Sequence, residues 1–191
     1  SMLTARGAGL DVDTLLPPCF VQPSDPGLQV CVLLDICHML KLIRNTLAKG
    51  GILIDAEGNK IRFRWQYLVE LHKLQQTEGL HLANKLSKVH LNFHTQKMKV
   101  SLAAQTISAS VATAIDFCNS QLHLIPFAGC EATVRFLYLS DKLFDLLNSR
   151  NPLAKGYKAP LRQTNMHIWE PFLDEAFDYI SNLRDTSCQL M

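Results

Sequence analysis

An apolar run that turns directly into a helical pattern, over residues 30–45, most constrains what this chain can fold into. β-Branched and aliphatic residues predict a buried strand over residues 29–34. Apolar residues then recur at helical spacing over residues 37–48, with Lys41 and Arg44 between them, as in an amphipathic helix. Asp35 lies at the junction of the two. It is either a carboxylate presented at a sheet edge, as a divalent cation requires, or simply the cap of the helix, which the pattern alone favours.

Helical patterns dominate the rest of the chain. Four prolines and no sustained periodicity predict an extended lead-in over residues 1–27. Residues 52–54 and 61–63 predict a small hairpin, residues 80–94 short helical turns, and residues 150–165 a basic loop. Further helices are expected over residues 64–77, 96–120, 131–148 and 169–184, with Gly79 ending the first and Pro171 in the first turn of the last. The predicted fold class is mainly α, with a short β element near the N-terminus.

Composition excludes several classes of protein. The apolar share of 48% is enough for a core in a chain of 191 residues. No apolar run approaches the roughly 18 residues of a membrane span, and no signal peptide is visible, so no membrane association is expected. Six cysteines lie far apart without a CxxC pair, which predicts neither a zinc ribbon nor a disulfide framework. The cysteines therefore indicate a reduced, intracellular protein.

An acid-free stretch over residues 79–115 is the best candidate for anion binding. It contains Lys85, Lys88, Lys97 and Lys99 and no Asp or Glu. Lysines without local counter-charge suit a phosphate, and the N-terminus of the predicted helix 96–120 lies among them. The alternative is a solvated basic face or a contact with nucleic acid.

Asp145 and Asn148 form a second candidate. They are three residues apart on the predicted helix 131–148 and so share a face. A carboxylate can accept two guanine donors while an amide donates to O6 or N7. The simpler interpretation is an ordinary polar stripe, in which Asn148 helps to end the helix. His90 and His94 have the spacing of a zinc pair, but no third ligand is evident.

Several segments together resemble the P-element-type DNA transposases, including their THAP-domain-linked relatives. The resemblance covers roughly residues 28–175. Its segments are residues 35–45, 78–80, 83–86, 97–106, 110–112, 147–152 and 155–162. The family implies an RNase H-like core, whose acids bind Mg²⁺ for strand cleavage and transfer, interrupted by a helical insertion domain that binds GTP. This divides the chain into a lead-in (1–27), a partial core segment (28–49) and the insertion domain (50–185).

By this resemblance, Asp35 is a metal-binding catalytic acid. The guanosine nucleotide would lie against Lys85, Lys99 and Val100, with Asp145 and Asn148 reading the base. The expected cofactors are GTP and Mg²⁺. The expected partners are transposon-end DNA and further copies of the protein, in the nucleus. The other catalytic acids of the family have no convincing counterpart, so this chain alone is not expected to cut DNA. The alternative function is a domesticated helical module that binds protein or nucleic acid without a nucleotide.

Overall fold

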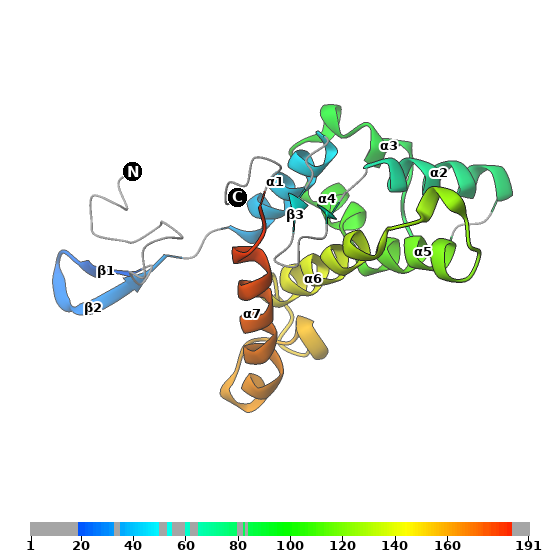
Figure 1. Ribbon diagram of the computed structural model, residues 1–191. Helices are drawn as coiled ribbons and strands as arrows, with labels where there is room; N and C mark the ends of the chain where they lie inside the picture. Colours follow the sequence, from blue (N-terminus) through cyan, green and yellow to red (C-terminus); the bar gives the residue numbers. More distant parts are fainter. Residues whose placement is uncertain are drawn as a thin grey trace. The chain divides into compact units, whose positions relative to one another are not determined.

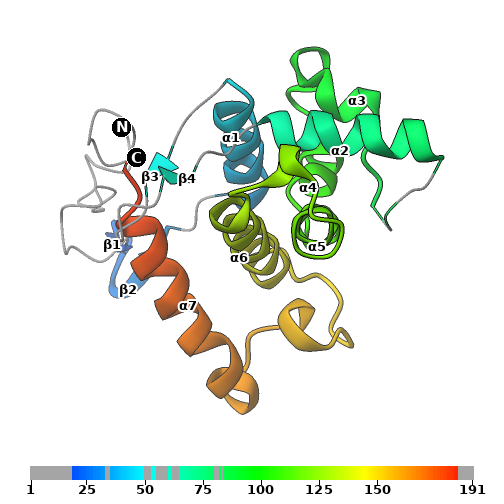
Figure 2. The ribbon, with the colours of Figure 1, turned by 45° about the vertical axis from the view of Figure 1, so that its right-hand side comes forward.

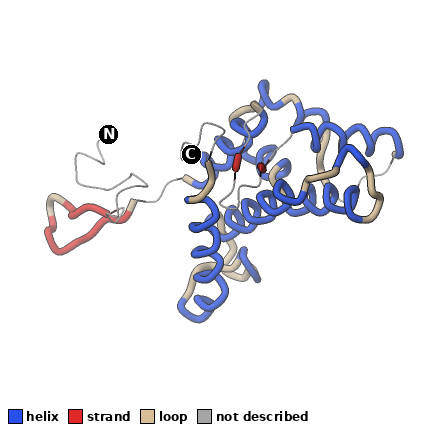
Figure 3. The backbone as a smooth tube through the Cα atoms, viewed as in Figure 1, coloured by secondary structure: helices blue, strands red, loops and turns tan. Residues whose placement is uncertain are grey.

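The computed structural model describes residues 19–32, 35–49, 53–54, 60–61, 65–79, 82 and 84–184. These residues belong to two compact units, Ser1–Asp35 and Ile36–Met191. The described part is mostly helical, with short strands, as Figures 1 and 3 show. The mainly α fold predicted from the sequence, with a β element near its start, is confirmed.

The first unit contains an antiparallel hairpin that the sequence did not predict. Strand β1 (Cys19–Gln22) pairs with β2 (Asp25–Cys31), and Pro23 and Ser24 form the turn. Most of β2 is exposed, whereas the pattern predicted a buried strand at residues 29–34. The sequence did not indicate this hairpin because Pro23 and Pro26 lie in it, and proline usually disfavours a strand. A two-stranded hairpin nevertheless leaves open edges on which Pro26 costs no ladder hydrogen bond. Leu33 and Leu34 lie outside the described residues.

The second unit is a helical bundle. Its helices are α1 (Ile36–Ala48), α2 (Trp65–Glu78), α3 (Lys88–Leu91), α4 (Val100–Thr106), α5 (Ala109–Ser120), α6 (Glu131–Leu147) and α7 (Met166–Ser181). Short 3-10 turns η2 (Phe93–Gln96), η3 (Ile125–Phe127), η4 (Gly156–Lys158) and η5 (Gln163–Asn165) connect them. Strands β3 (Leu53–Ile54) and β4 (Lys60–Ile61) pair with each other, and Ile54 also bridges to Arg184 after α7. Most of the predicted hairpin loop lies outside the described residues.

The core forms where apolar helix faces meet. Leu71, Val111, Ile115 and Leu137, from α2, α5 and α6, have no exposed surface. The most extensive helix contacts are α5 on α6 and α1 on α4, followed equally by α1 on α6, α2 on α5 and α6 on α7. Ala103 and Ala112 are also fully buried, so small side chains allow close helix approach, as the sequence predicted. Gly79 has a φ of 64° after α2, the left-handed conformation in which glycine ends a helix.

The prediction of one long helix over residues 96–120 is wrong. It is two helices, α4 and α5, separated at Ile107 and Ser108. The Ser108 hydroxyl donates to the Gln105 carbonyl at 3.0 Å and accepts from the Val111 amide at 3.4 Å, so it caps α5. By length and composition Val100–Ser120 could cross a bilayer, but helices that fill a protein core meet the same criterion. Here the stretch packs against α1, α2 and α6.

Helix α7 also begins earlier than predicted, at Met166. Pro171 therefore lies inside the helix and not in its first turn. The side-chain oxygen Oδ1 of Asn165, just before the helix, accepts from the Arg162 amide at 2.9 Å and from the Trp169 indole at 3.0 Å. These hydrogen bonds to the Asn165 side chain allow α7 to begin at Met166. The prediction placed the start at residue 169 because it depended on the apolar pattern alone.

Candidate functional site

Helix α1 connects the two groups of residues that the sequence singled out. Near its start, the Cys37 thiol lies 3.8 Å from the Asn148 side-chain oxygen. Further along, Arg44 donates to the Gln96 and Lys97 carbonyls at 3.3 and 2.7 Å. Positions seven residues apart share a helix face and are separated by roughly 10 Å. The end of α6 and the segment before α4 are therefore held along one side of α1 (Figure 2).

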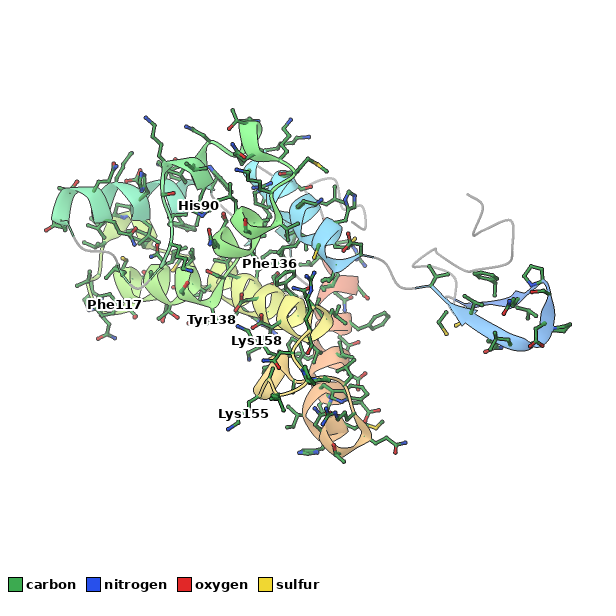
Figure 4. The ribbon with its side chains drawn as sticks, turned by 180° about the vertical axis from the view of Figure 1, so that it is seen from behind. His90, Phe117, Phe136, Tyr138, Lys155 and Lys158 are labelled. Atoms are coloured by element: carbon green, nitrogen blue, oxygen red, sulfur yellow. The ribbon has the colours of Figure 1, made fainter. Side chains whose placement is uncertain are left out.

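The polar end of α6 brings two carboxylates close to the η4 loop. Asp145 is half-buried, and its carboxylate lies 3.5 Å from the Lys158 ammonium. Asp141 lies one turn earlier, where burial, with a smaller contribution from the Asp145 charge, raises the pKa of its carboxyl group. The Ala109 amide and Lys158 oppose that shift. In Figure 4, Lys158 lies beside α6, whereas Lys155 projects from the same loop away from that helix.

The basic segment before α4 is open to solvent. Lys97 and Lys99 are exposed, Val100 is half-buried, and Lys99 is the residue immediately before α4. The sequence predicted phosphate binding at the N-terminus of a long helix near residues 95–99. Helix α4 has only seven residues, so this prediction loses the dipole of a long helix. The exposed Lys97 and Lys99 remain as candidates for phosphate binding.

Lys85 is also exposed, in the loop that precedes α3. Its neighbour Asn84 is buried and builds that loop, accepting from the Leu86 amide at 3.0 Å and donating to the Leu82 carbonyl at 3.4 Å. Helix α3 packs on α4, whose first residue is Val100. The loop of Lys85 is thus connected to α4 through α3.

The histidines do not form a metal pair. His90 is buried, and its ring nitrogens contact the Ser87 hydroxyl at 2.8 Å and the Gln105 side chain at 2.9 Å. His94 is exposed, and its ring lies against that of Phe93 at an interplanar angle of 37°. Across the described ranges, no three His, Cys, Asp or Glu side chains lie close enough to hold a metal. Asp35 is exposed and ends the first unit.

Arg44 is the residue whose importance the sequence did not reveal. It lies between apolar residues of α1, where an amphipathic pattern predicts an exposed cation, yet it has no exposed surface. Burial lowers the pKa of its guanidinium group. One sequence signal could have indicated this burial. The acid-free stretch offers Arg44 no carboxylate, so its acceptors there are two backbone carbonyls.

A separate cavity of about 620 Å³ opens between α5, α6 and α7. Its lining combines Asp116, Glu131 and Glu175 with Arg135 and Lys142. None of the residues predicted to contact a nucleotide lines it. Its mixture of both charges does not favour a polyphosphate.

Comparisons with known proteins identify the family of this helical domain. The family described as "TNP-like, GTP-binding insertion domain" matches residues 37–160. "DNA transposase THAP9" of Homo sapiens is 35% identical over 188 residues, which cover 98% of this chain and 20% of that protein. "Transposable element P transposase" of Drosophila melanogaster is 31% identical over 140 residues, 69% of this chain and 17% of that protein. The chain thus spans about a fifth of the length of these relatives.

A solved structure, the Drosophila P element transposase strand transfer complex, matches with a TM-score of 0.70 and 27% identity. The match covers 82% of this chain and 35% of the other. Together, the helical bundle and these matches define a transposase insertion domain. The chain belongs to the TNP-like, GTP-binding insertion domain family, of the P-element and THAP9 type, and the resemblance found in the sequence is confirmed.

Proposed function

We propose that this chain binds GTP between the α4 segment and the end of α6. The phosphates lie against Lys85, Lys99 and Val100, and Asp145 and Asn148 contact the guanine base. The observation that carries the proposal is the position of α1, which holds Asn148 and the Gln96–Lys97 carbonyls on one face. The family match over residues 37–160 includes all five proposed contacts.

Mg²⁺ would arrive with the nucleotide. Mg²⁺ retains several waters and is commonly held by substrate phosphates plus one or two carboxylates, so it does not require a preformed protein cage. This agrees with the lack of a three-ligand group among the described residues. Asp35 is proposed as a metal-binding acid of the RNase H-like core to which residues 28–49 would belong, with residues 50–185 as the inserted domain.

In the longer protein, the nucleotide-bound domain would support DNA strand cleavage and transfer in the nucleus. The partners would be transposon ends and further copies of the protein. This part of the proposal rests on the relatives, which are a DNA transposase and a P transposase, and on the strand transfer complex.

The test is thermal denaturation with GTP and Mg²⁺ against ATP and Mg²⁺. At 100 times the Kd, a ligand that binds only the folded state stabilises it by about 2.7 kcal/mol. For a chain of this size we expect a Tm rise of roughly 5–10 °C with GTP and a smaller one with ATP. Asp174→Asn, an exposed acid on α7, is the control and should respond like the wild type.

Equal shifts with GTP and ATP would remove the base-reading role of Asp145 and Asn148. No shift at millimolar GTP would overturn the proposal. It would favour an interaction module, whose exposed lysines should then bind nucleic acid with an affinity that falls steeply as salt rises.

A further inference from the structure

The guanidinium group of Arg44 is a buried cation that forms no ion pair with any described residue. Its side chain has no exposed surface. Nη2 donates to the Gln96 and Lys97 carbonyls, and Nε donates to the Asn45 side chain at 2.9 Å. Nη1 is buried and has no hydrogen-bond partner among the residues that the structure describes. These acceptors account for three of the five N–H groups of the guanidinium, and the two on Nη1 are left without one.

Within the part of the chain that the structure describes, no carboxylate forms an ion pair with this charge. The ion pairs found in the described chain are Lys73 with Glu70 and Lys158 with Asp145, and neither includes Arg44. The segment that covers Arg44 comes from the acid-free residues 79–115. Burial of an ion costs several kcal/mol of desolvation. The three hydrogen bonds and the Phe93 ring, whose centroid lies 6.0 Å from the guanidinium carbon, offset part of that cost but supply no negative charge. Its neighbours Lys97 and Lys99 add further positive charge at the surface directly above.

Building on the proposed function, we infer that Arg44 is a positioning residue for the nucleotide phosphates, which supply its missing negative charge. It acts in two ways. By bonding to the Gln96 and Lys97 carbonyls, it fixes the turn that carries Lys97 and Lys99. From inside the protein, where the dielectric constant is low, its charge attracts the phosphates more strongly than an exposed lysine does and is less screened by salt.

The same geometry gives Arg44 a role distinct from that of the base contacts. Asn148 meets α1 at Cys37, about two turns away from Arg44. A change at Arg44 should therefore reduce binding of the triphosphate and leave binding of the nucleoside intact. A purely structural arginine would affect both ligands equally, through the folding of the bundle.

The experiment measures the Kd of GTP and of guanosine by calorimetry for the wild type, Arg44→Gln and Arg44→Lys. Glutamine retains a donor for the two carbonyls but removes the charge, and we expect about tenfold weaker GTP binding with guanosine binding unchanged. Lysine retains the charge but not the planar set of donors, so Arg44→Lys should bind GTP less tightly than the wild type and more tightly than Arg44→Gln. Arg135→Gln, on α6 outside the proposed site, is the control and should match the wild type for both ligands.

Three results would overturn the inference: Arg44→Gln that binds GTP as the wild type does, Arg44→Lys that loses as much affinity as Arg44→Gln, or equal losses for GTP and guanosine. A wild type that binds no GTP would instead overturn the proposed function.

If Arg44→Gln does not fold, the triple variant Lys85→Gln/Lys97→Gln/Lys99→Gln, which removes the exposed lysines of the proposed phosphate site, carries the test. It should still bind GTP about tenfold more tightly than guanosine, because the buried charge remains. Equal affinity for the two ligands would exclude Arg44 as a phosphate-positioning residue.

Discussion

The Lys158 ammonium lies 3.5 Å from the Asp145 carboxylate and links the η4 loop to α6. Both side chains retain solvent contact, with 67% of Lys158 and 27% of Asp145 exposed. The acid proposed to read guanine thus has a nearby cation that is free to move aside, since the pair is loose and at the surface.

Lys158→Met should lower the free energy of unfolding by less than about 1 kcal/mol, because exposed ion pairs contribute little. Chemical denaturation measures this directly. Lys155→Met, a lysine of the same loop, provides the baseline for removing one surface charge. A loss of several kcal/mol would mean that the ion pair anchors the loop to the core.

Asp145→Asn should shift the preference from guanosine to xanthosine triphosphate. Xanthine has a carbonyl where guanine has its 2-amino group, so an amide donor matches it and a carboxylate does not. Competition between the two nucleotides for the variant and the wild type measures the change. Asp174→Asn should retain the wild-type preference, and an unchanged preference in Asp145→Asn would exclude Asp145 from the base pocket.

Asp141→Asn should stabilise the chain near neutral pH. Burial raises the pKa of the Asp141 carboxyl group, so its ionised form is less favourable in the folded state than in the unfolded state. The wild type therefore loses stability as pH rises from the unfolded pKa of about 4 through the raised folded value.

The Tm difference between Asp141→Asn and the wild type should be largest at about pH 7. It should vanish below about pH 4, where Asp141 is protonated in both the folded and the unfolded state. Asp174→Asn, whose side chain is exposed, should show no such trend. A variant that is less stable than the wild type at neutral pH would mean that the hydrogen bond from the Ala109 amide outweighs the cost of burial.

Ser108→Ala should destabilise the chain by about 0.5–1 kcal/mol, because it removes the N-cap acceptor of α5. The 3.4 Å contact with the Val111 amide is long, which places the effect at the lower end. Ser108→Asp preserves an acceptor and should recover most of the loss. Ser101→Ala, an exposed position inside α4, should be neutral or slightly stabilising, and an equal loss there would contradict the capping role.

The amino-acid sequence by itself determined the helices whose signals are local. Helices α2 and α6 follow from apolar periodicity, and the end of α2 follows from Gly79, because these preferences depend on neighbours along the chain. The family also followed from the sequence, since its segments are spread over most of the chain. Ser108 was a local signal too, but the apolar and small residues around it concealed the cap.

Only the tertiary structure decided which polar residues are buried and what they contact. The pattern of α1 makes Arg44 an outward-facing cation, yet the packing of α1 on α4 encloses it and gives it carbonyl partners more than fifty positions later in the chain. His90 is likewise buried by its bonds to Ser87 and Gln105 and is not a metal ligand. Periodicity reports which face of a helix is apolar, whereas burial of a charge depends on the energy of contacts between segments distant in sequence.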